Sequence, residues 1–194
     1  MNFDRIYMAL LHYPVYNKTG EVVASSITNH DLHDLARLNA TFGLAGYFIV
    51  CPLELQRKLA GRLIQHWLTG PGAEQNWTRK EAFQRASVVA ELAEVKNAVR
   101  EQTGQGPKLV ATTARGAGGQ IGYRALRDKM DQEAGQSWLI LFGTGWGLTR
   151  EFLDQEADYL LKPILGSGDY NHLSVRSASA IILDRLFAID RTAD

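Results

Sequence analysis

Residues 138–148 read WLILFGTGWGL, an apolar run from Trp138 to Phe142 that ends in a turn with three glycines. The run is the most strand-like in the chain, and the glycines stop it. A second glycine-rich turn, GSGDYNHLS at residues 166–174, follows the apolar stretch 157–161 and precedes a helical pattern. Glycine adopts positive φ and has no Cβ. Two such turns therefore predict a place where bare backbone approaches a polar, flat, nucleotide-like ligand.

Strand-like and helical stretches alternate along the chain. Apolar runs predict strands at Arg5 to His12, Gly46 to Val50, Ser87 to Val89, Lys108 to Thr112, Trp138 to Phe142 and Ala157 to Leu161. Helical spacing predicts a helix from Asn29 or His30 to Gly43 and another from Pro52 to a breaker at Gly70-Pro71-Gly72. A capping-box pattern at Thr78 and Glu81 predicts the start of a short helix. Further helices are predicted over residues 92–103, 123–133, 148–155 and 174–186. Parallel strands need crossovers, so this order predicts an α/β fold: a mostly parallel sheet of about six strands with helices on both faces.

The composition fits one globular domain over residues 1–194, with 45% hydrophobic and 22% charged residues. Lys and Arg total 21 and Asp and Glu total 21, so nucleic-acid binding would depend on a local basic face. Cys51 is the single cysteine, which excludes an intramolecular disulfide and a cysteine-based metal cluster. The sequence has no recognisable signal peptide or membrane span, so we expect a soluble cytoplasmic protein.

The ligand site is expected at one edge of the sheet, because ligands of open parallel sheets bind beyond the carboxyl ends of the strands. Three loops should meet there: Thr112 to Arg115, Gly143 to Gly147, and Pro163 to His172. The GTGWG turn is neither the GxGxxG dinucleotide fingerprint nor a P-loop, which ends in Gly-Lys-Ser/Thr. The sequence has no nucleophile elbow either. These patterns therefore do not favour a nicotinamide enzyme, an ATPase or a hydrolase.

The motif FGTGWGL and the later stretch PIxGxGDYNHLSVRSA resemble the carboxy-terminal region of the SPOUT class of S-adenosylmethionine-dependent RNA methyltransferases. Within that class the chain is similar to a small bacterial group of SAM-dependent RNA methyltransferases related to tRNA guanine methyltransferases. The likeness continues through residues 15–20, 27–37, 70–76 and 111–115, and so covers nearly the whole chain. The resemblance implies a C-terminal trefoil knot, a homodimer, and an RNA substrate, with tRNA favoured.

The resemblance also implies where S-adenosylmethionine binds. The loops after the fourth and fifth strands and the knot loop surround the donor in that class, which corresponds here to Thr112, Thr113, Phe142, Gly143, Gly145, Gly147, Ile164, Gly166, His172 and Leu173. Backbone amides would hold the adenine edge between apolar walls. The sulfonium is already a good leaving group, so the protein has mainly to place the two reactants in line.

Catalytic and substrate-binding residues are assigned by the same resemblance. Arg37 resembles the motif-one arginine of the ribose-methylating branch, where this region of a partner subunit completes the pocket, and Asn29 resembles an upstream asparagine. The spacing of these two residues differs slightly from that branch, and Ser174 stands where it has asparagine, so ribose methylation is not specified.

A carboxylate base serves the guanine-methylating branch of the class. Asp169 is the candidate for that role in this chain, with Asp31 and Asp34 as alternatives. Arg115 lies in a loop beside the predicted pocket, which is where an RNA phosphate would arrive.

Other roles for these residues stay open. The glycines of GTGWG would equally suit a tight turn, His172 a helix cap or an interface, and Trp146 a contact with a partner subunit. His30, His33 and Asp34 have metal-ligand types at close spacing, but two positions three or four apart on one helix face, with no third ligand nearby, more often form a hydrated surface or a cap, so we expect no metal. The alternative function is a non-catalytic SAM- or nucleotide-binding module that partners another RNA enzyme, which the neutral charge and the lack of an obvious base favour.

Overall fold

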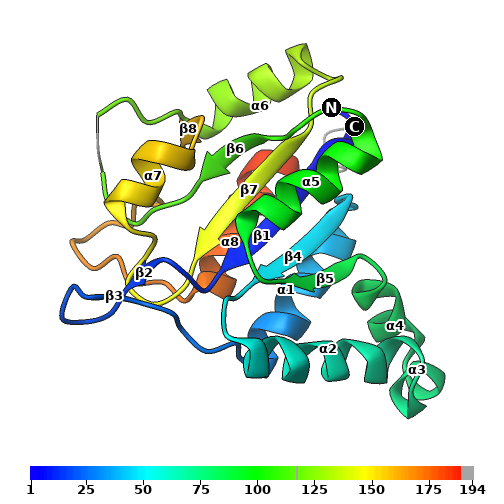
Figure 1. Cartoon of the computed structure of the whole chain (residues 1–194). Coiled ribbons are helices and arrows are strands. Elements are labelled where there is room, and N and C mark those ends of the chain that lie inside the picture. The colour runs from blue at the N-terminus through cyan, green and yellow to red at the C-terminus, as the bar shows by residue number, and fades with distance from the viewer. Residues whose placement is uncertain (117, 189–194) are drawn as a thin grey trace.

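The computed structural model describes residues 1–116 and 118–188 (Figure 1). Six strands form one sheet in the order β5-β4-β1-β7-β6-β8, and every pairing in it is parallel. The strands are β1 (Ile6–Leu11), β4 (Gly46–Val50), β5 (Ala86–Val89), β6 (Lys108–Ala111), β7 (Trp138–Gly143) and β8 (Tyr159–Leu160). The predicted α/β class and parallel sheet are confirmed, whereas the trefoil knot stays a prediction.

Helices cover both faces of the sheet, because successive side chains of a strand point to opposite sides. Ile6, Met8 and Leu10 of β1 belong to one buried cluster and Tyr7, Ala9 and Leu11 to the other. The first cluster is completed by α1 (Asn29–Thr41), α2 (Glu54–Leu68), α4 (Trp77–Phe83), α6 (Tyr123–Gln132) and α8 (Val175–Phe187). The second is completed by α5 (Leu92–Thr103) and α7 (Arg150–Glu156) (Figure 1).

Several predicted helix ends are wrong by a few residues. The α1 helix begins at Asn29, as predicted, but its cap is Thr28, whose side chain accepts from the Asp31 N–H. The α4 cap is Asn76, and Thr78 lies inside the helix, so the predicted capping box does not form. The α2 helix begins at Glu54 instead of Pro52. The helix ends at Leu68, just before the predicted breaker, which is confirmed. The short helix α3 (Pro71–Gln75), which Pro71 starts, was not predicted.

A small hairpin interrupts the connection from β1 to α1. Its strands β2 (Val15–Tyr16) and β3 (Val22–Val23) are antiparallel, and sequence periodicity did not predict them because each has two residues. A short 3-10 helix, η1 (Phe3–Arg5), precedes β1. Across residues 1–116 and 118–188, no helix combines the length and the apolar character needed to cross a membrane.

The order of the strands places a topological switch point between β1 and β7. The chain leaves β1 toward β4 on one side and leaves β7 toward β8 on the other. Loops at such a point diverge and open a crevice at the carboxyl edge of the sheet. In Figure 1 the strand arrowheads point toward this edge, where the hairpin and the loops after β7 and β8 gather.

Candidate functional site

Hydrogen bonds tie the predicted loops together at the carboxyl edge. The Thr112 N–H and hydroxyl both donate to the Leu141 carbonyl, at 3.0 and 2.9 Å, which fixes the end of β6 against β7. The Asn171 side-chain amide donates to the Ala114 carbonyl at 2.9 Å and so joins the loop after β8 to the loop after β6. The loops that follow β6, β7 and β8 therefore lie side by side.

The turn after β7 packs on the hairpin. The Trp146 N–H donates to the Tyr16 carbonyl at 2.9 Å, and the Tyr16 N–H donates to the Gly147 carbonyl at 3.0 Å. Gly145 has φ +58°, and a Cβ there would lie 2.8 Å from the Tyr16 oxygen; one at Gly143 would lie 2.8 Å from Leu148 Cγ. Packing within the chain thus accounts for glycine at positions 143 and 145. Contact of these two residues with a donor stays a prediction.

Aromatic rings line the same edge. The His172 ring lies 5.5 Å from the Trp146 ring and 5.3 Å from the Tyr170 ring, both in edge-on geometry. The Arg115 guanidinium carbon lies 5.7 Å from the centre of the Tyr16 ring. We call these five residues, Tyr16, Arg115, Trp146, Tyr170 and His172, the edge cluster. Tyr16 and Tyr170 were not singled out from the sequence. Tyr170 lies within the second glycine-rich turn, which was the available signal, whereas Tyr16 lies in β2 and carries no such signal.

The loop after β8 leaves its main chain free. Within the described residues, no backbone N–H from Ile164 to Val175 donates a hydrogen bond to another group of the protein. Ile164 is half-buried against the core, whereas Gly166, Asp169 and Leu173 are exposed. These amides are available to a ligand that brings its own acceptors.

The residues predicted for catalysis lie in two places. Arg37 is exposed on α1 beside a shallow hollow that it shares with Asp34, Leu38, Thr41, Ser174, Arg176, Ser177 and Ala180. Asn29 is exposed in the first turn of α1. Asp169 makes no hydrogen bond or ion pair with the residues that the structure describes, and no contact joins it to Arg37. Within the described residues of one copy, neither a hydrogen bond nor an ion pair joins Arg37 to Asp169, and Asp169 does not line the Arg37 hollow.

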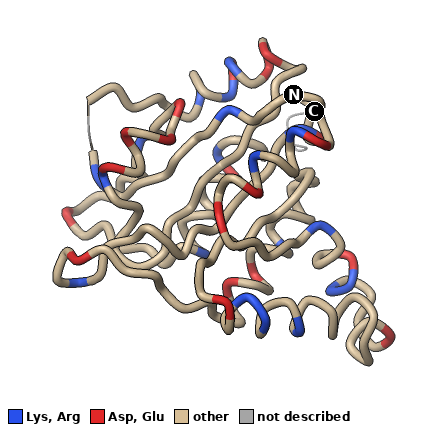
Figure 2. The backbone as a smooth tube through the Cα atoms, in the orientation of Figure 1, with Lys and Arg blue, Asp and Glu red and all other residues tan. Residues whose placement is uncertain are grey.

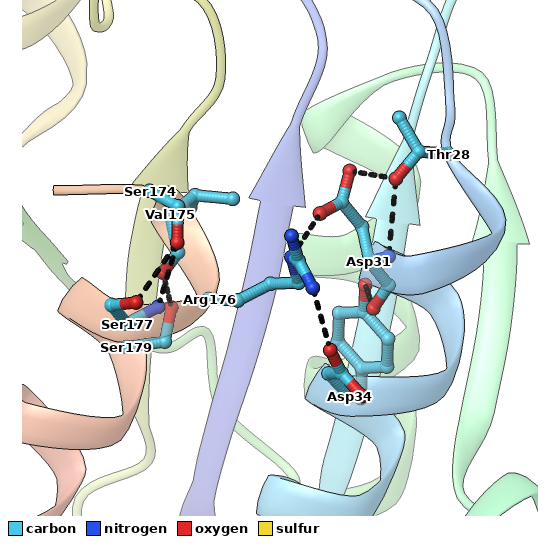
Figure 3. A network of polar contacts seen from close by, with 9 residues as sticks. Thr28, Asp31, Asp34, Ser174, Val175, Arg176, Ser177 and Ser179 are labelled. Atoms are coloured by element: carbon cyan, nitrogen blue, oxygen red, sulfur yellow. Dashed lines mark hydrogen bonds and ion pairs between the residues drawn. The ribbon is translucent and has the colours of Figure 1, made fainter.

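The other two candidate bases are held in a polar network between α1 and α8 (Figure 3). Arg176 Nη1 lies 2.9 Å from Asp34 Oδ2, and Arg176 Nε lies 3.5 Å from Asp31 Oδ1. The Thr28 hydroxyl donates to the buried Asp31 carboxylate at 2.6 Å. Both carboxylates are engaged by Arg176, so neither is free to face a substrate.

A buried histidine at the switch point was missed from the sequence. His12 directly follows β1 and is fully buried, with Nδ1 3.0 Å from the Ser25 hydroxyl, which in turn bonds the Thr144 hydroxyl of the GTGWG turn. Burial lowers the pKa of His12 to about 4, although the nearby Asp31 carboxylate and the Ser26 backbone act in the opposite direction. A polar residue that ends a central buried strand was the signal for it.

Positive and negative charges are mixed over the surface. Each α-helix of seven or more residues has both basic and acidic residues in its sequence. Figure 2 shows positions of both signs spread along the backbone. Among the residues that the structure describes, no group of three or more His, Cys, Asp or Glu could hold a metal ion.

Comparison with known proteins decides the family. A family model described as SAM-dependent RNA methyltransferase matches residues 5–188. The chain belongs to this family. It is 44% identical to a tRNA (guanine-N(1)-)-methyltransferase of Oleidesulfovibrio alaskensis over 93% of its own length and 41% of the relative's. It is also 42% identical to an uncharacterized protein of Aquifex aeolicus, over 97% of this chain and 91% of that one. The SAM-dependent family predicted from the sequence is confirmed.

Solved structures agree on the fold. The SpoU methyltransferase AviRb of Streptomyces viridochromogenes superposes with a TM-score of 0.58 at 17% identity, over 96% of this chain and 60% of that one. A probable methylase family protein of Haemophilus influenzae gives 0.59 at 20% identity, over 94% of this chain and 64% of that one. At such identities the likeness shows the fold alone, which is the SPOUT-like fold that the sequence predicted.

The carboxyl edge fits the methyl donor that the family uses. The adenine and amino-acid ends of S-adenosylmethionine carry hydrogen-bonding groups, and the loop from Ile164 to Val175 offers unpaired backbone amides. A Cβ at Gly147 or Gly166 would meet nothing within 4 Å, so the main chain is open to close approach. Ile164 and Leu173 add the apolar surface that an adenine ring needs.

Proposed function

We propose that this chain is an S-adenosylmethionine-dependent methyltransferase of RNA, with tRNA as its substrate, and that it works in the cytoplasm as one domain over residues 1–194. The match of residues 5–188 to a family of such enzymes carries the proposal. The chain spans 41% of the length of its tRNA methyltransferase relatives, so the activity of those longer proteins supports this assignment without fixing it.

The donor would be held by the loops of the carboxyl edge, in the region of Thr112, Thr113, Phe142, Gly143, Gly145, Gly147, Ile164, Gly166, His172 and Leu173. Bound S-adenosylmethionine supplies a methyl group activated by its sulfonium sulfur. Free amides of the loop after β8 donate to the bound molecule, and the half-buried Ile164 excludes water from one side of it. The protein's contribution is placement of the acceptor atom in line with the methyl group.

Asp169 serves as the base in this proposal. A nitrogen or hydroxyl that receives a methyl group must lose a proton, and a carboxylate beside it accepts that proton. Asp169 is exposed and without an ion pair among the described residues, whereas Asp31 and Asp34 are paired with Arg176. Arg115, exposed in the loop after β6, binds a phosphate of the substrate.

A homodimer would complete the site. Arg37 lies beside the first turn of α8 in a hollow whose lining does not include Asp169, and in this proposal the hollow of one copy faces the donor loops of a second copy. There Arg37 and Asn29 orient the substrate backbone. Mixing an Arg37→Ala chain with an Asp169→Asn chain should restore part of the activity that each loses alone. Absence of recovery in the mixed dimers counts against the shared site.

Two measurements test the function. Calorimetric titration should show micromolar-range binding of S-adenosylmethionine, of about −8 kcal/mol, and no binding of NAD. Single-turnover transfer of labelled methyl groups to total tRNA should be lost in Asp169→Asn with donor binding retained. Binding of NAD instead of the methyl donor would refute the proposal.

The second candidate function is a non-catalytic module that binds the donor and partners another RNA enzyme. It is favoured by the length of the tRNA methyltransferase relatives, in which more than half of the protein lies outside the region matched by this chain. Such a module would bind S-adenosylmethionine in the titration and transfer no methyl group in the single-turnover experiment.

A further inference from the structure

Two large aromatic side chains of the edge cluster project into solvent. The Trp146 side chain is 52% exposed and the Tyr170 side chain 82% exposed. Exposed aromatic surface is unfavourable in water, and a group of such rings on a soluble protein commonly marks a binding surface. His172 lies between them and contacts both rings edge-on, at 5.5 and 5.3 Å. The rings are therefore grouped in one place while at least half of the surface of Trp146 and most of that of Tyr170 stay accessible.

The backbone that carries these rings is held in place. The Trp146 N–H donates to the Tyr16 carbonyl in the hairpin, and the Asn171 side chain donates to the Ala114 carbonyl in the loop after β6. Arg115 lies over the Tyr16 ring and closes the cluster on the other side. A ring on a backbone that is held in place loses less conformational entropy when a flat ligand binds, and this applies most directly to Trp146.

The chemistry of the cluster suits an unpaired base better than a duplex. Aromatic faces bind any nucleobase by stacking, provided that the base is free of its helix. A duplex would instead need several phosphate contacts, and Arg115 is the single cationic member of the cluster. Asp169, next to Tyr170, adds a negative charge that repels a phosphate backbone.

We propose that Trp146 and Tyr170 form a stacking platform for unpaired bases of the RNA that receives the methyl group. This inference rests on the proposed function, which supplies the RNA, and adds that the substrate is recognised in a loop or other single-stranded segment. Stacking of bases beside the donor site holds the neighbouring nucleotide in reach of the donor.

Fluorescence anisotropy with a labelled single-stranded RNA and with its duplex tests the platform. Trp146→Ala and Tyr170→Ala should each weaken single-strand binding roughly tenfold and leave duplex binding unchanged. Trp146→Phe should retain most of the affinity, because it keeps an aromatic face. Trp77→Ala is the matched control, since Trp77 is 72% exposed on α4 and lies outside the edge cluster. Thermal unfolding of each variant checks that the fold is intact.

Three results would overturn the platform: unchanged single-strand binding in both alanine variants, equal losses for single strand and duplex, or conversion of a dimer to monomers by Trp146→Ala with a matching loss of RNA binding.

Methyl transfer measured on the same preparations separates this inference from the proposed function. Ring-dependent binding without transfer supports the platform and refutes the enzyme. Transfer that both alanine variants retain in full supports the enzyme and refutes the platform. A wild-type chain that binds no single-stranded RNA refutes the platform outright.

Discussion

The two glycine-rich turns, residues 143–147 and 166–174, look alike in the sequence and differ in the structure. In the first turn the chain itself fills the space beside the glycines, and a Cβ at Gly145 would lie 2.8 Å from the Tyr16 carbonyl oxygen. In the second turn a Cβ at Gly166 would meet nothing within 4 Å, and the amides around it have no partner among the described residues. Glycine therefore permits close packing in one turn and leaves the main chain accessible in the other.

The largest expected effect is on the stability of the first turn, residues 143–147, which we call the packed turn; the second, residues 166–174, is the open turn. Gly145→Val should lower the free energy of unfolding by about 4 kcal/mol, because a β-branched residue is strained at φ +58° and its Cβ overlaps the Tyr16 oxygen. Chemical denaturation measures the loss. Gly168→Val is the matched control, since its Cβ has open space around it, and we expect a change within about 0.5 kcal/mol. Equal losses at the two positions would contradict the comparison.

The regular part of the fold was predictable because each element carries a local signal. The buried strand β7 is a continuous apolar run, and the apolar residues of α1 recur at helical spacing. The hairpin β2–β3 was not predicted, since strands of two residues have no periodicity. The short helix α3 was not predicted either, because Gly and Pro usually end a helix and here Pro71 begins one.

The candidate site was predictable only as a set of loops. Parallel strands bring their carboxyl ends to one edge, which places the loops after β6, β7 and β8 together. The contact of Tyr16 with Gly145 joins residues far apart in the sequence, and no local pattern encodes it. His12 likewise contacts Ser25, in the segment between β3 and α1, and no local pattern encodes that contact.

The packed turn should also depend on pH through His12, which bonds Ser25 and through it Thr144. Burial lowers the folded-state pKa of His12 to about 4, below the ordinary value of 6.5, so the unfolded chain binds a proton more readily. The stability due to the neutral imidazole is fully present above about pH 6.5 and is lost as the pH falls toward 4. The loss amounts to about 3 kcal/mol.

Urea denaturation between pH 7 and pH 4 measures this dependence. His12→Gln keeps a side chain that can bond Ser25 and removes the titrating group, so its stability should change less over the same range. His30→Gln is the control, because His30 is exposed in the first turn of α1 and its loss should leave the slope as in the wild type. If His12→Gln shows the same dependence of unfolding free energy on pH as the wild type, His12 is not the titrating group.

A smaller effect is expected where the open turn joins α8. Arg176→Ala should cost about 1 kcal/mol of stability, because the mostly buried Asp31 loses its ion pair while the Thr28 hydroxyl still bonds it. Arg150→Ala, just after the packed turn, removes an exposed pair with Asp154 and should cost a few tenths of that. Thermal denaturation compares the two variants. A larger loss for Arg150→Ala would show that the α1–α8 network does not anchor the open turn.

The smallest change in stability should accompany the clearest change in donor binding. Gly166→Val places its side chain in open space, so unfolding should shift by no more than about 0.5 kcal/mol. The same side chain would cover the free amides of the loop after β8, and the affinity for S-adenosylmethionine should fall roughly tenfold in a calorimetric titration. Gly61→Val, at an open position on the outer face of α2, should leave donor affinity unchanged. If Gly166→Val binds S-adenosylmethionine as tightly as the wild type, the unpaired amides of the open turn do not contact the donor.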